Sequence, residues 1–483
     1  MKTNTGGRWR RILLLSVTSM AASVTMSYGS VMISTGATQN ISCSSGVCTP
    51  TARKAVLNVN DLASMLASGN VTISSRSVAQ DIVVEASLSW TSSSALTLDA
   101  YRSLTVNKPI VVAGAGRLTI DSDDGGTSGD LQFFAKGHIE FWDLSSSLVI
   151  NGNSYALAKN IKQIGSLARH HTPYIALAKK FNAAHYLAVS LTHAPIILEG
   201  LGNTISNLTI VDSTFRGDVG LFASIAMVRD LRLVNANVTG TSEDQRVGAI
   251  AGDSGTFINC YASGQVSAQG QGSFAGGLTG ANAGTLSRTQ SAVAVTGSSG
   301  IEGAGGLVGV NEGTIDQSYS TGSVSGGDGV MVGGLVGYST GGAGFGGVIS
   351  NSYASGNVTG GNNAFVGGLI GTNATNPEEN TNPTVSSSYS TGTVSGGSGA
   401  TIGGLIGTDT APPAISSTYW DLDTSGISDP SKGAGNVAND PGITGLTTTQ
   451  FQSGLPSGFS SSIWAEKGSV NGGYPYLTAL LGN

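Results

Sequence analysis

Charged side chains, prolines and cysteines are scarce in this chain. Of its 483 residues, 11% are charged, 12 are proline and 3 are cysteine, whereas 72 are glycine. The net charge is −6, and Arg288 is the only basic side chain from residue 247 to residue 409. That stretch therefore has no basic stripe to follow phosphates, so we expect no nucleic acid partner. The missing Gly-X-Y period also excludes a collagen.

Motifs for metal and phosphate chemistry are also missing. None of the five histidines stands in a His-Glu-x-x-His motif, and no glycine-rich segment ends in Gly-Lys-Ser or Gly-Lys-Thr. His138, Ile139 and Glu140 lack the second histidine that a zinc site of this kind needs. We therefore predict no catalytic, cofactor-binding or metal-ligating residue.

The three cysteines have two different interpretations. Cys43 and Cys48 enclose four residues, and the oxidising conditions that exported chains meet make this pair a candidate disulfide. Metal binding by the pair is not expected, because no histidine or third cysteine lies nearby to complete a tetrahedral set. Cys260 stands where other repeats carry serine or threonine, which favours a small stacked side chain over a reactive thiol.

One apolar run stands at the N-terminus, and no other segment is long and apolar enough to span a bilayer. Residues 12–26 are apolar with some serine and threonine, and they follow a basic stretch that contains Lys2 and Arg8. The small residues Ser27 and Gly29, on either side of Tyr28, suit a cleavage site, so residues 1–29 are predicted to be a signal peptide. The alternative, a membrane anchor, would need about 18–20 apolar residues. We expect an exported chain without a transmembrane segment after cleavage.

A glycine-rich phrase recurs through the second half of the chain. The clearest copies, Ala-Gly-Gly-Leu-Val-Gly and its variants, occupy residues 304–309, 332–337, 366–371 and 402–407, and weaker copies occupy 219–224, 247–252 and 275–280. The first four steps from copy to copy are 28 or 29 residues, and the last two are 34 and 36. A fixed period indicates stacked units, which offer a long regular surface rather than a single deep pocket.

Each phrase is followed by the same apolar and aromatic positions. Ile315, Tyr319 and Val324 follow Leu307, and equivalent residues follow the other copies, although Gln290 interrupts the tyrosine column. Three short β-prone stretches per repeat cannot bury a face alone, but stacked coils can. The columns therefore predict an all-β fold, a parallel β-helix (β-solenoid) with coils of about 28 residues and glycine at the positive-φ corners. Columns that stay in phase also argue against disorder.

The chain is expected to have five segments. They are a signal peptide at 1–29, a flexible lead-in at 30–54, an irregular β-solenoid at 55–218, the repeat β-solenoid at 219–426 and a hydrophobic C-terminal cap at 427–483. Residues 60–66 favour a short capped helix. Apolar residues spaced from Leu157 to Ala168 predict a second helix of about 12 residues on the side of the solenoid.

The repeats resemble the GLUG motif. The phrase and the following Ser-Tyr-Ser-Thr-Gly-Ser-Val match it over residues 247–419. Such repeats occur in bacterial surface and secreted proteins, including filamentous-haemagglutinin-like adhesins and non-catalytic parts of some IgA-cleaving metallopeptidases. The resemblance implies a right-handed β-helix, export to the medium or the bacterial cell surface, and adhesion to a host or environmental surface glycan or protein. It also suggests an outer-membrane secretion partner, although the Asn-Pro-Asn signatures of two-partner secretion are not found.

Two alternatives to adhesion stay open. A β-helix can be a polysaccharide-acting enzyme, but such enzymes need clustered carboxylates, and the acids of the repeats are scattered. Asp421 and Asp423 beside Trp420 could suit a sugar or a cation, and a capping turn is the other interpretation. The second alternative is a substrate-binding fragment related to the repeat regions of IgA peptidases.

Variation in repeat length predicts a binding face. The valine column precedes the next phrase by 8 or 9 residues, whereas the last glycine of a phrase precedes the tyrosine column by 9 to 18. Insertions therefore leave one corner and form adjacent loops at 338–346 and 372–383, and such loops are often a solenoid's binding face. They can equally be tolerated slack, since longer loops cost little. The candidate ligand-binding residues are Tyr338, Phe345, Asn373, Glu378, Glu379 and Asn380.

Overall fold

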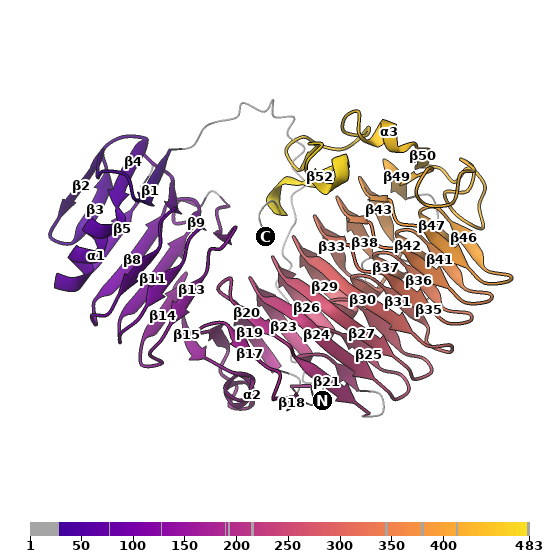
Figure 1. Cartoon of the computed structure of the whole chain (residues 1–483), viewed down its shortest axis with the longest axis horizontal. Coiled ribbons are helices and arrows are strands. Elements are labelled where there is room, and N and C mark those ends of the chain that lie inside the picture. Colours follow the sequence, from indigo (N-terminus) through magenta and orange to yellow (C-terminus); the bar gives the residue numbers. More distant parts are fainter. Residues whose placement is uncertain are drawn as a thin grey trace, which may run out of the picture.

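The computed structural model describes residues 29–480, apart from 77, 127, 189, 192–193, 214–216, 343–345, 377, 379–380 and 412–413. All but the last residue of the predicted signal peptide therefore lies outside the described residues. The fold is mostly β, with several parallel sheets. The described residues form three α-helices, α1 (Val59–Ser68), α2 (Ile161–Arg169) and α3 (Thr448–Phe451). Figure 1 shows the N-terminal strands and the repeat strands as two limbs of an open curve. The C-terminal segment lies beside the last strands of the repeat limb.

The start of every phrase forms a strand of one sheet, here called the phrase sheet. Its strands are parallel and in register, so that Ala304 pairs with Val332, Val332 with Val366 and Val366 with Ile402. In order, the strands are β22 (Asp218–Val219), β25 (Arg246–Gly248), β28 (Phe274–Gly276), β31 (Gly303–Gly305), β36 (Met331–Gly333), β41 (Phe365–Gly367) and β46 (Thr401–Gly403).

The end of the phrase and the residues after it form a second set of parallel strands, the loop sheet. Its strands are β16 (Tyr174–Leu177), β19 (Ala194–Glu199), β23 (Phe222–Arg229), β26 (Ala251–Ile258), β29 (Thr279–Ser287), β32 (Val308–Asn311), β33 (Thr314–Asp316), β37 (Val336–Ser339), β38 (Val348–Ser350), β42 (Ile370–Asn373), β43 (Thr384–Ser386), β47 (Ile406–Asp409) and β48 (Ile415–Ser416). The insertions predicted above separate β37 from β38 and β42 from β43.

The tyrosine and valine columns form a third sheet, the tyrosine sheet. Its main strands are β20 (Thr204–Ser206), β21 (Thr209–Asp212), β24 (Arg232–Gly240), β27 (Tyr261–Ala268), β30 (Gln290–Gly297), β34 (Tyr319–Ser320), β35 (Val324–Gly326), β39 (Tyr353–Ala354), β40 (Val358–Gly360), β44 (Tyr389–Ser390), β45 (Val394–Gly396), β49 (Thr418–Asp421) and β50 (Ile443–Leu446). Each repeat thus contributes strands to three sheets, as the sequence predicted.

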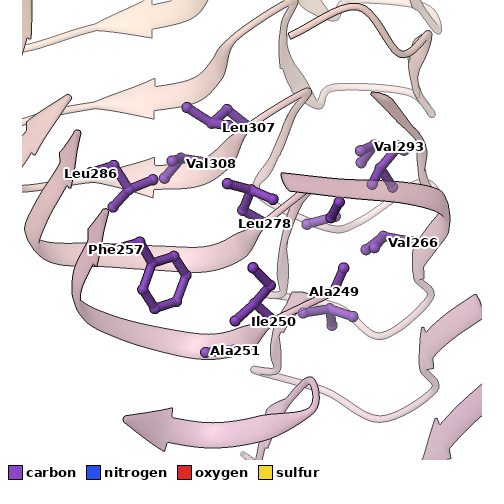
Figure 2. Close-up of a cluster of buried hydrophobic side chains, with 14 of the residues drawn as sticks. Ala249, Ile250, Ala251, Phe257, Val266, Leu278, Leu286, Val293, Leu307 and Val308 are labelled. Carbon is purple, nitrogen blue, oxygen red and sulfur yellow. The ribbon is translucent and has the colours of Figure 1, made fainter. Parts of the chain in front are cut away.

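The predicted apolar columns are confirmed. Leu307, Leu335, Leu369 and Leu405 are fully buried, and backbone hydrogen bonds of 2.8–2.9 Å join each to the next. Figure 2 shows the earlier part of this column, with Leu278 between Ile250 and Leu307 in neighbouring layers. Since each leucine covers the one before it, the repeats share one continuous core.

The expectation that glycine forms all corners is wrong for one corner. Between the loop sheet and the tyrosine sheet the positive-φ residue is polar and never glycine in seven successive layers. Asparagine, aspartate and serine, which hold five of these positions, tolerate this conformation because their short side chains can bond locally. The seven residues are Asp230, Asn259, Arg288, Gln317, Asn351, Ser387 and Ser417. The phrase glycines instead permit close approach: a Cβ on Gly305 would lie 2.0 Å from the Val308 carbonyl oxygen.

The N-terminal section also consists mainly of stacked parallel strands, without the phrase. Its strands are β1 (Ser30–Ser34), β2 (Ile41–Ser44), β3 (Val47–Pro50), β4 (Lys54–Asn58), β5 (Val71–Ser74), β6 (Asp81–Val84), β7 (Leu88–Trp90), β8 (Ala95–Ala100), β9 (Leu104–Val106), β10 (Ile110–Val112), β11 (Arg117–Ser122), β12 (Leu131–Phe133), β13 (Ile139–Phe141), β14 (Ser147–Ile150) and β15 (Asn153–Ala158). The predicted flexible lead-in at 30–54 needs correction, because β1 pairs with β4 and β6, and β3 pairs with β5. Cys43 and Cys48 face each other across the β2–β3 hairpin and are joined by a disulfide.

The C-terminal segment does more than cover the last repeat. Strand β50 continues the tyrosine sheet beyond β49, and residues 447–480 then fold back over the tyrosine column. Tyr319, Tyr353 and Tyr389 stack there with ring centroids 4.6 and 4.9 Å apart, and Trp464 packs against the last two. This segment therefore buries one lateral face of the repeats as well as their end.

Candidate functional site

The two longest insertions lie side by side at one corner of the repeats. Strands β37 and β42 that lead into them are paired, with Tyr338 opposite Thr372. The loops also contact each other, since the side-chain amide of Asn376 donates to the Gly341 carbonyl oxygen at 2.7 Å. The second loop is closed by a bridge between Asn376 and Thr381. The structure thus brings the described residues of 340–347 and 374–383 together in one surface feature, here called the loop pair.

The predicted ligand-binding residues differ in how accessible they are to a ligand. Glu378 is exposed, and its backbone N–H donates to the Asn376 side chain at 3.0 Å, which orients the loop tip. Tyr338 is half-buried at the base of the first loop. Phe345, Glu379 and Asn380 lie outside the described residues. The loop pair therefore presents at least one acidic side chain on a supported turn.

The prediction that Asn373 binds a ligand is wrong, because its side chain is fully buried. Its amide donates to Asp409 at 3.1 Å, and Asn282 donates to Asn311 at 2.7 Å in the same way. These side chains point inward at the end of loop-sheet strands and belong to a buried polar column. The sequence did not distinguish this column from the loop beside it, because both are rich in asparagine.

A partly buried ion cluster connects the N-terminal section to the repeats. Asp130 accepts from Arg229 at 2.5 Å and from Arg288 at 3.0 Å, while Glu199 lies 3.7 Å from Arg229. Burial, followed by the charge of Asp230, raises the pKa of Glu199 well above its ordinary value. Burial also raises the pKa of Asp230 to about 7. Glu199 and Asp230 are only 2% and 3% exposed, so they are poorly accessible to a ligand. The role of the cluster is therefore to hold the two limbs together, and we call it the clamp.

This cluster was not predictable from the sequence. Asp130 and Arg288 are 158 positions apart, and nothing in their local sequence distinguishes them from other surface charges. The one available signal was that Arg288 is the only basic residue from residue 247 to residue 409. A lone charge of that kind needs a partner from another part of the chain when it is buried.

A cavity of about 300 Å³ lies beside this clamp, where the turn between β12 and β13 faces the first repeats. We call it the junction cavity. Its wall combines aromatic, basic and amide side chains from both limbs. The lining residues are Phe133, Phe134, Ala135, Lys136, Gly137, His138, Lys180, Gly202, Asn203, Thr204, Asp230, Arg232, Asn259, Tyr261 and Gln290. None of them was predicted as a site residue, since they become neighbours only through the fold.

Other candidate chemistry has structural explanations. Asp421 is fully buried and accepts hydrogen bonds from the Tyr474 hydroxyl at 2.6 Å and the Thr448 hydroxyl at 2.7 Å, which holds the C-terminal segment. Cys260 is buried, and burial raises its thiol pKa. Across the described ranges, no group of three or more histidine, cysteine or acidic side chains is placed to hold a metal ion. The helices found there are all too short or too polar to cross a membrane.

Comparison with known proteins gives few matches. No curated protein matches the chain. Among solved structures, a crystal structure titled as that of "a putative immunoglobulin A1 protease from Bacteroides ovatus" is similar, with a TM-score of 0.42 and 16% sequence identity, over 68% of this chain and 92% of that chain. The family model described as the GLUG motif matches residues 328–359, which contain the 332–337 phrase and the strands after it. The chain therefore contains a GLUG motif.

Proposed function

We propose that this chain is a secreted, non-catalytic β-solenoid that presents an extended binding surface for adhesion. In this proposal the stacked sheets form a right-handed parallel β-helix, related to filamentous-haemagglutinin-like proteins, and the chain acts outside the cell or on a bacterial surface. The partner is a surface glycan or protein, and an outer-membrane partner assists secretion.

The observation that carries this proposal is the loop pair on a rigid scaffold. Loop-sheet strands pair in strict register below it, as Ser339 with Asn373 and Asn373 with Asp409. A scaffold held by in-register hydrogen bonds positions its loops with little loss of conformational entropy on binding. The contact between Asn376 and Gly341 makes the two loops one surface. The GLUG motif and the predicted signal peptide support export.

Shortening the second loop tests the adhesive surface. Replacing residues 374–383 by a linker as short as that of the 402–407 repeat should leave the thermal unfolding temperature nearly unchanged, because loop length costs little. Adhesion to the native surface should fall at least tenfold. Glu378→Gln tests the charge alone, and Glu243→Gln, an exposed acid in another turn, is its matched control. Unchanged adhesion in a folded loop variant would remove the loop pair from the function.

Export is tested separately by fractionating the native host. The proposal expects the protein in the medium or on the outer surface, with residues 1–29 removed. Retention in the cytoplasm with an intact N-terminus would contradict export.

One observation favours a second candidate, a polysaccharide-acting enzyme. Glu199 and Asp130 line a further cavity of about 200 Å³ together with Tyr155 and Arg229. A carboxyl with a raised pKa beside a second carboxylate is the pairing that glycoside hydrolysis uses. Release of reducing sugars or unsaturated uronate from an acidic polysaccharide, lost in Glu199→Gln, would establish this candidate in place of non-catalytic adhesion.

A further inference from the structure

Arg232 in the junction cavity is a partly buried cation without an ionic partner in the described chain. Its guanidinium carbon lies 4.5 Å from the centre of the Tyr261 ring, and no described carboxylate comes within ion-pair distance. Burial lowers the pKa of its guanidinium. Arg229 and Arg288 nearby are both paired with Asp130. A desolvated charge without a partner is costly, so an anionic ligand is the missing complement.

Two further cations face the same cavity. Lys136 and Lys180 are exposed and form no ion pair within the described residues. His138 adds a ring whose Nε2 lies 3.5 Å from Glu140. Asp230 is the acid in the wall, but its carboxylate is engaged by Arg229 and by the Asn259 amide. A chain with a net charge of −6 thus gathers three unpaired cations at one cavity.

The other residues of the cavity wall favour a ligand that has apolar and hydroxyl groups as well as a negative charge. Phe134 and Tyr261 provide apolar surface, and Thr204, Asn259 and Gln290 provide hydroxyl and amide groups. Inorganic anions need only cations and N–H donors, whereas a sugar acid carries a carboxylate, several hydroxyls and an apolar C–H face. The volume is at the small end of ligand sites, about 300–1,000 Å³, which suits one or two sugar units.

A row of paired residues leads from the wall of the junction cavity along the repeats. Arg232 pairs with Tyr261, Tyr261 with Gln290, and Gln290 with Tyr319 in successive strands of the tyrosine sheet. Tyr319 in turn lines a second cavity of about 190 Å³ beside Asn471 and Leu477 of the C-terminal segment. Successive units of a linear ligand would therefore meet successive strands, about 4.8 Å apart.

We propose that the junction cavity binds a carboxylated sugar as part of an acidic oligosaccharide, with Arg232, Lys136 and Lys180 holding the carboxylate. This proposal rests on the proposed function for the ligand's class, because an exported surface protein meets environmental glycans. It assigns that binding to the concave junction of the two limbs, apart from the loop pair.

Calorimetric titration of the full-length secreted protein with trigalacturonate tests the site. Binding should weaken at least tenfold in Arg232→Gln and in the Lys136→Gln/Lys180→Gln double variant, and it should weaken as salt rises. The lysines are exposed, so the double variant keeps the test valid if Arg232→Gln disturbs folding. Arg246→Gln, which removes an arginine paired with Asp253 on another face, is the matched control and should bind as the wild type does.

Neutral cellotriose and inorganic phosphate complete the experiment. The proposal expects no binding of cellotriose and at least tenfold weaker binding of phosphate. Equal binding of phosphate would reduce the cavity to a general anion site, and unaltered trigalacturonate binding in both cavity variants would overturn the assignment. Because surface adhesion is assayed with the loop variants, loss of this site and loss of the proposed function give different results.

Discussion

The two limbs of the molecule stack parallel strands by different means. Residues 55–218 contain 12 glycines in 164 positions, whereas residues 219–426 contain 45 in 208. The N-terminal core holds large rings such as Trp90, Phe133 and Phe141. Between Phe257 and Trp420 the described core of the repeats holds only aliphatic residues and Cys260. Stacking itself thus does not require the phrase, since both limbs achieve it.

The phrase glycines bring backbone segments into close contact where each repeat turns from the phrase sheet to the loop sheet. A Cβ on Gly306 would lie 2.2 Å from the Gly334 carbonyl oxygen, and one on Gly367 would lie 2.0 Å from that of Ile370. No side chain fits in such a space, so these turn positions require glycine, while leucine, isoleucine and valine columns fill the core beside them. The N-terminal limb has close glycine contacts too, as where a Cβ on Gly114 would lie 1.9 Å from the Thr91 carbonyl oxygen, but they are fewer, and its core gains burial from large rings.

Leu335→Asp is the change that should break the repeat limb most completely. Leu335 is fully buried between Leu307 and Leu369, so the substitution places an unpaired carboxylate in a narrow apolar column. The expected loss of stability is at least about 3 kcal/mol, visible as unfolding at a lower denaturant concentration. Val211→Asp is the matched control, because Val211 is 62% exposed. Equal stability of the two variants would mean that the column is not core.

Gly367→Ala should show that a single methyl group at a phrase glycine destabilises the repeat limb. The new Cβ would press on backbone atoms of Ile370 and Gly407 at 2.0 and 2.5 Å, so two strands must shift, at a cost of about 2–3 kcal/mol. Gly69→Ala in the N-terminal limb meets nothing within 4 Å and should be nearly neutral. Thermal unfolding of both variants checks this, and similar melting temperatures would contradict the requirement for glycine at position 367.

The repeats were the predictable part of the structure, for a physical reason. A column needs the same residue type at the same step, and that constraint is visible in one sequence, as for Ile315 over Ile349 and Val324 over Val358. Asn373 was misplaced because a strand end and a loop start look alike in sequence. Asp130 with Arg288, and the junction cavity, could not be predicted, because their neighbours come from distant segments. The return of the C-terminal segment over Tyr389 likewise left no periodic signal.

The clamp between the limbs should make stability depend on pH. An unfolded aspartate titrates near pH 3.9, whereas folded Asp230 titrates at about 7 because burial disfavours its charge. The folded state therefore holds an extra proton between about pH 4 and pH 7. Its stability should fall as pH rises through that window and level off above it. The raised pKa of Glu199 changes the stability in the same direction.

Asp230→Asn isolates this contribution. The amide keeps the acceptor for Asn259 but does not titrate, so the stability of the wild type relative to the variant should fall with pH by on the order of 1 kcal/mol per unit. Urea unfolding at pH 4, 5.5 and 7 measures it. A stability difference between wild type and variant that does not change with pH would show that folding does not raise the pKa of Asp230.

Tyr389→Phe should have the smallest effect, and a local one. The Tyr389 hydroxyl donates to the Pro475 carbonyl oxygen at 2.5 Å and accepts from the Asn471 amide at 2.9 Å, so its loss loosens the C-terminal segment from the repeat limb. Removing it should cost about 1 kcal/mol and raise hydrogen exchange within residues 464–480. Tyr319→Phe is the matched control, because that hydroxyl bonds to Gln290 within the repeats. If both variants exchange alike in the C-terminal segment, the tyrosine column holds it by ring packing alone, and the hydroxyl contacts add nothing.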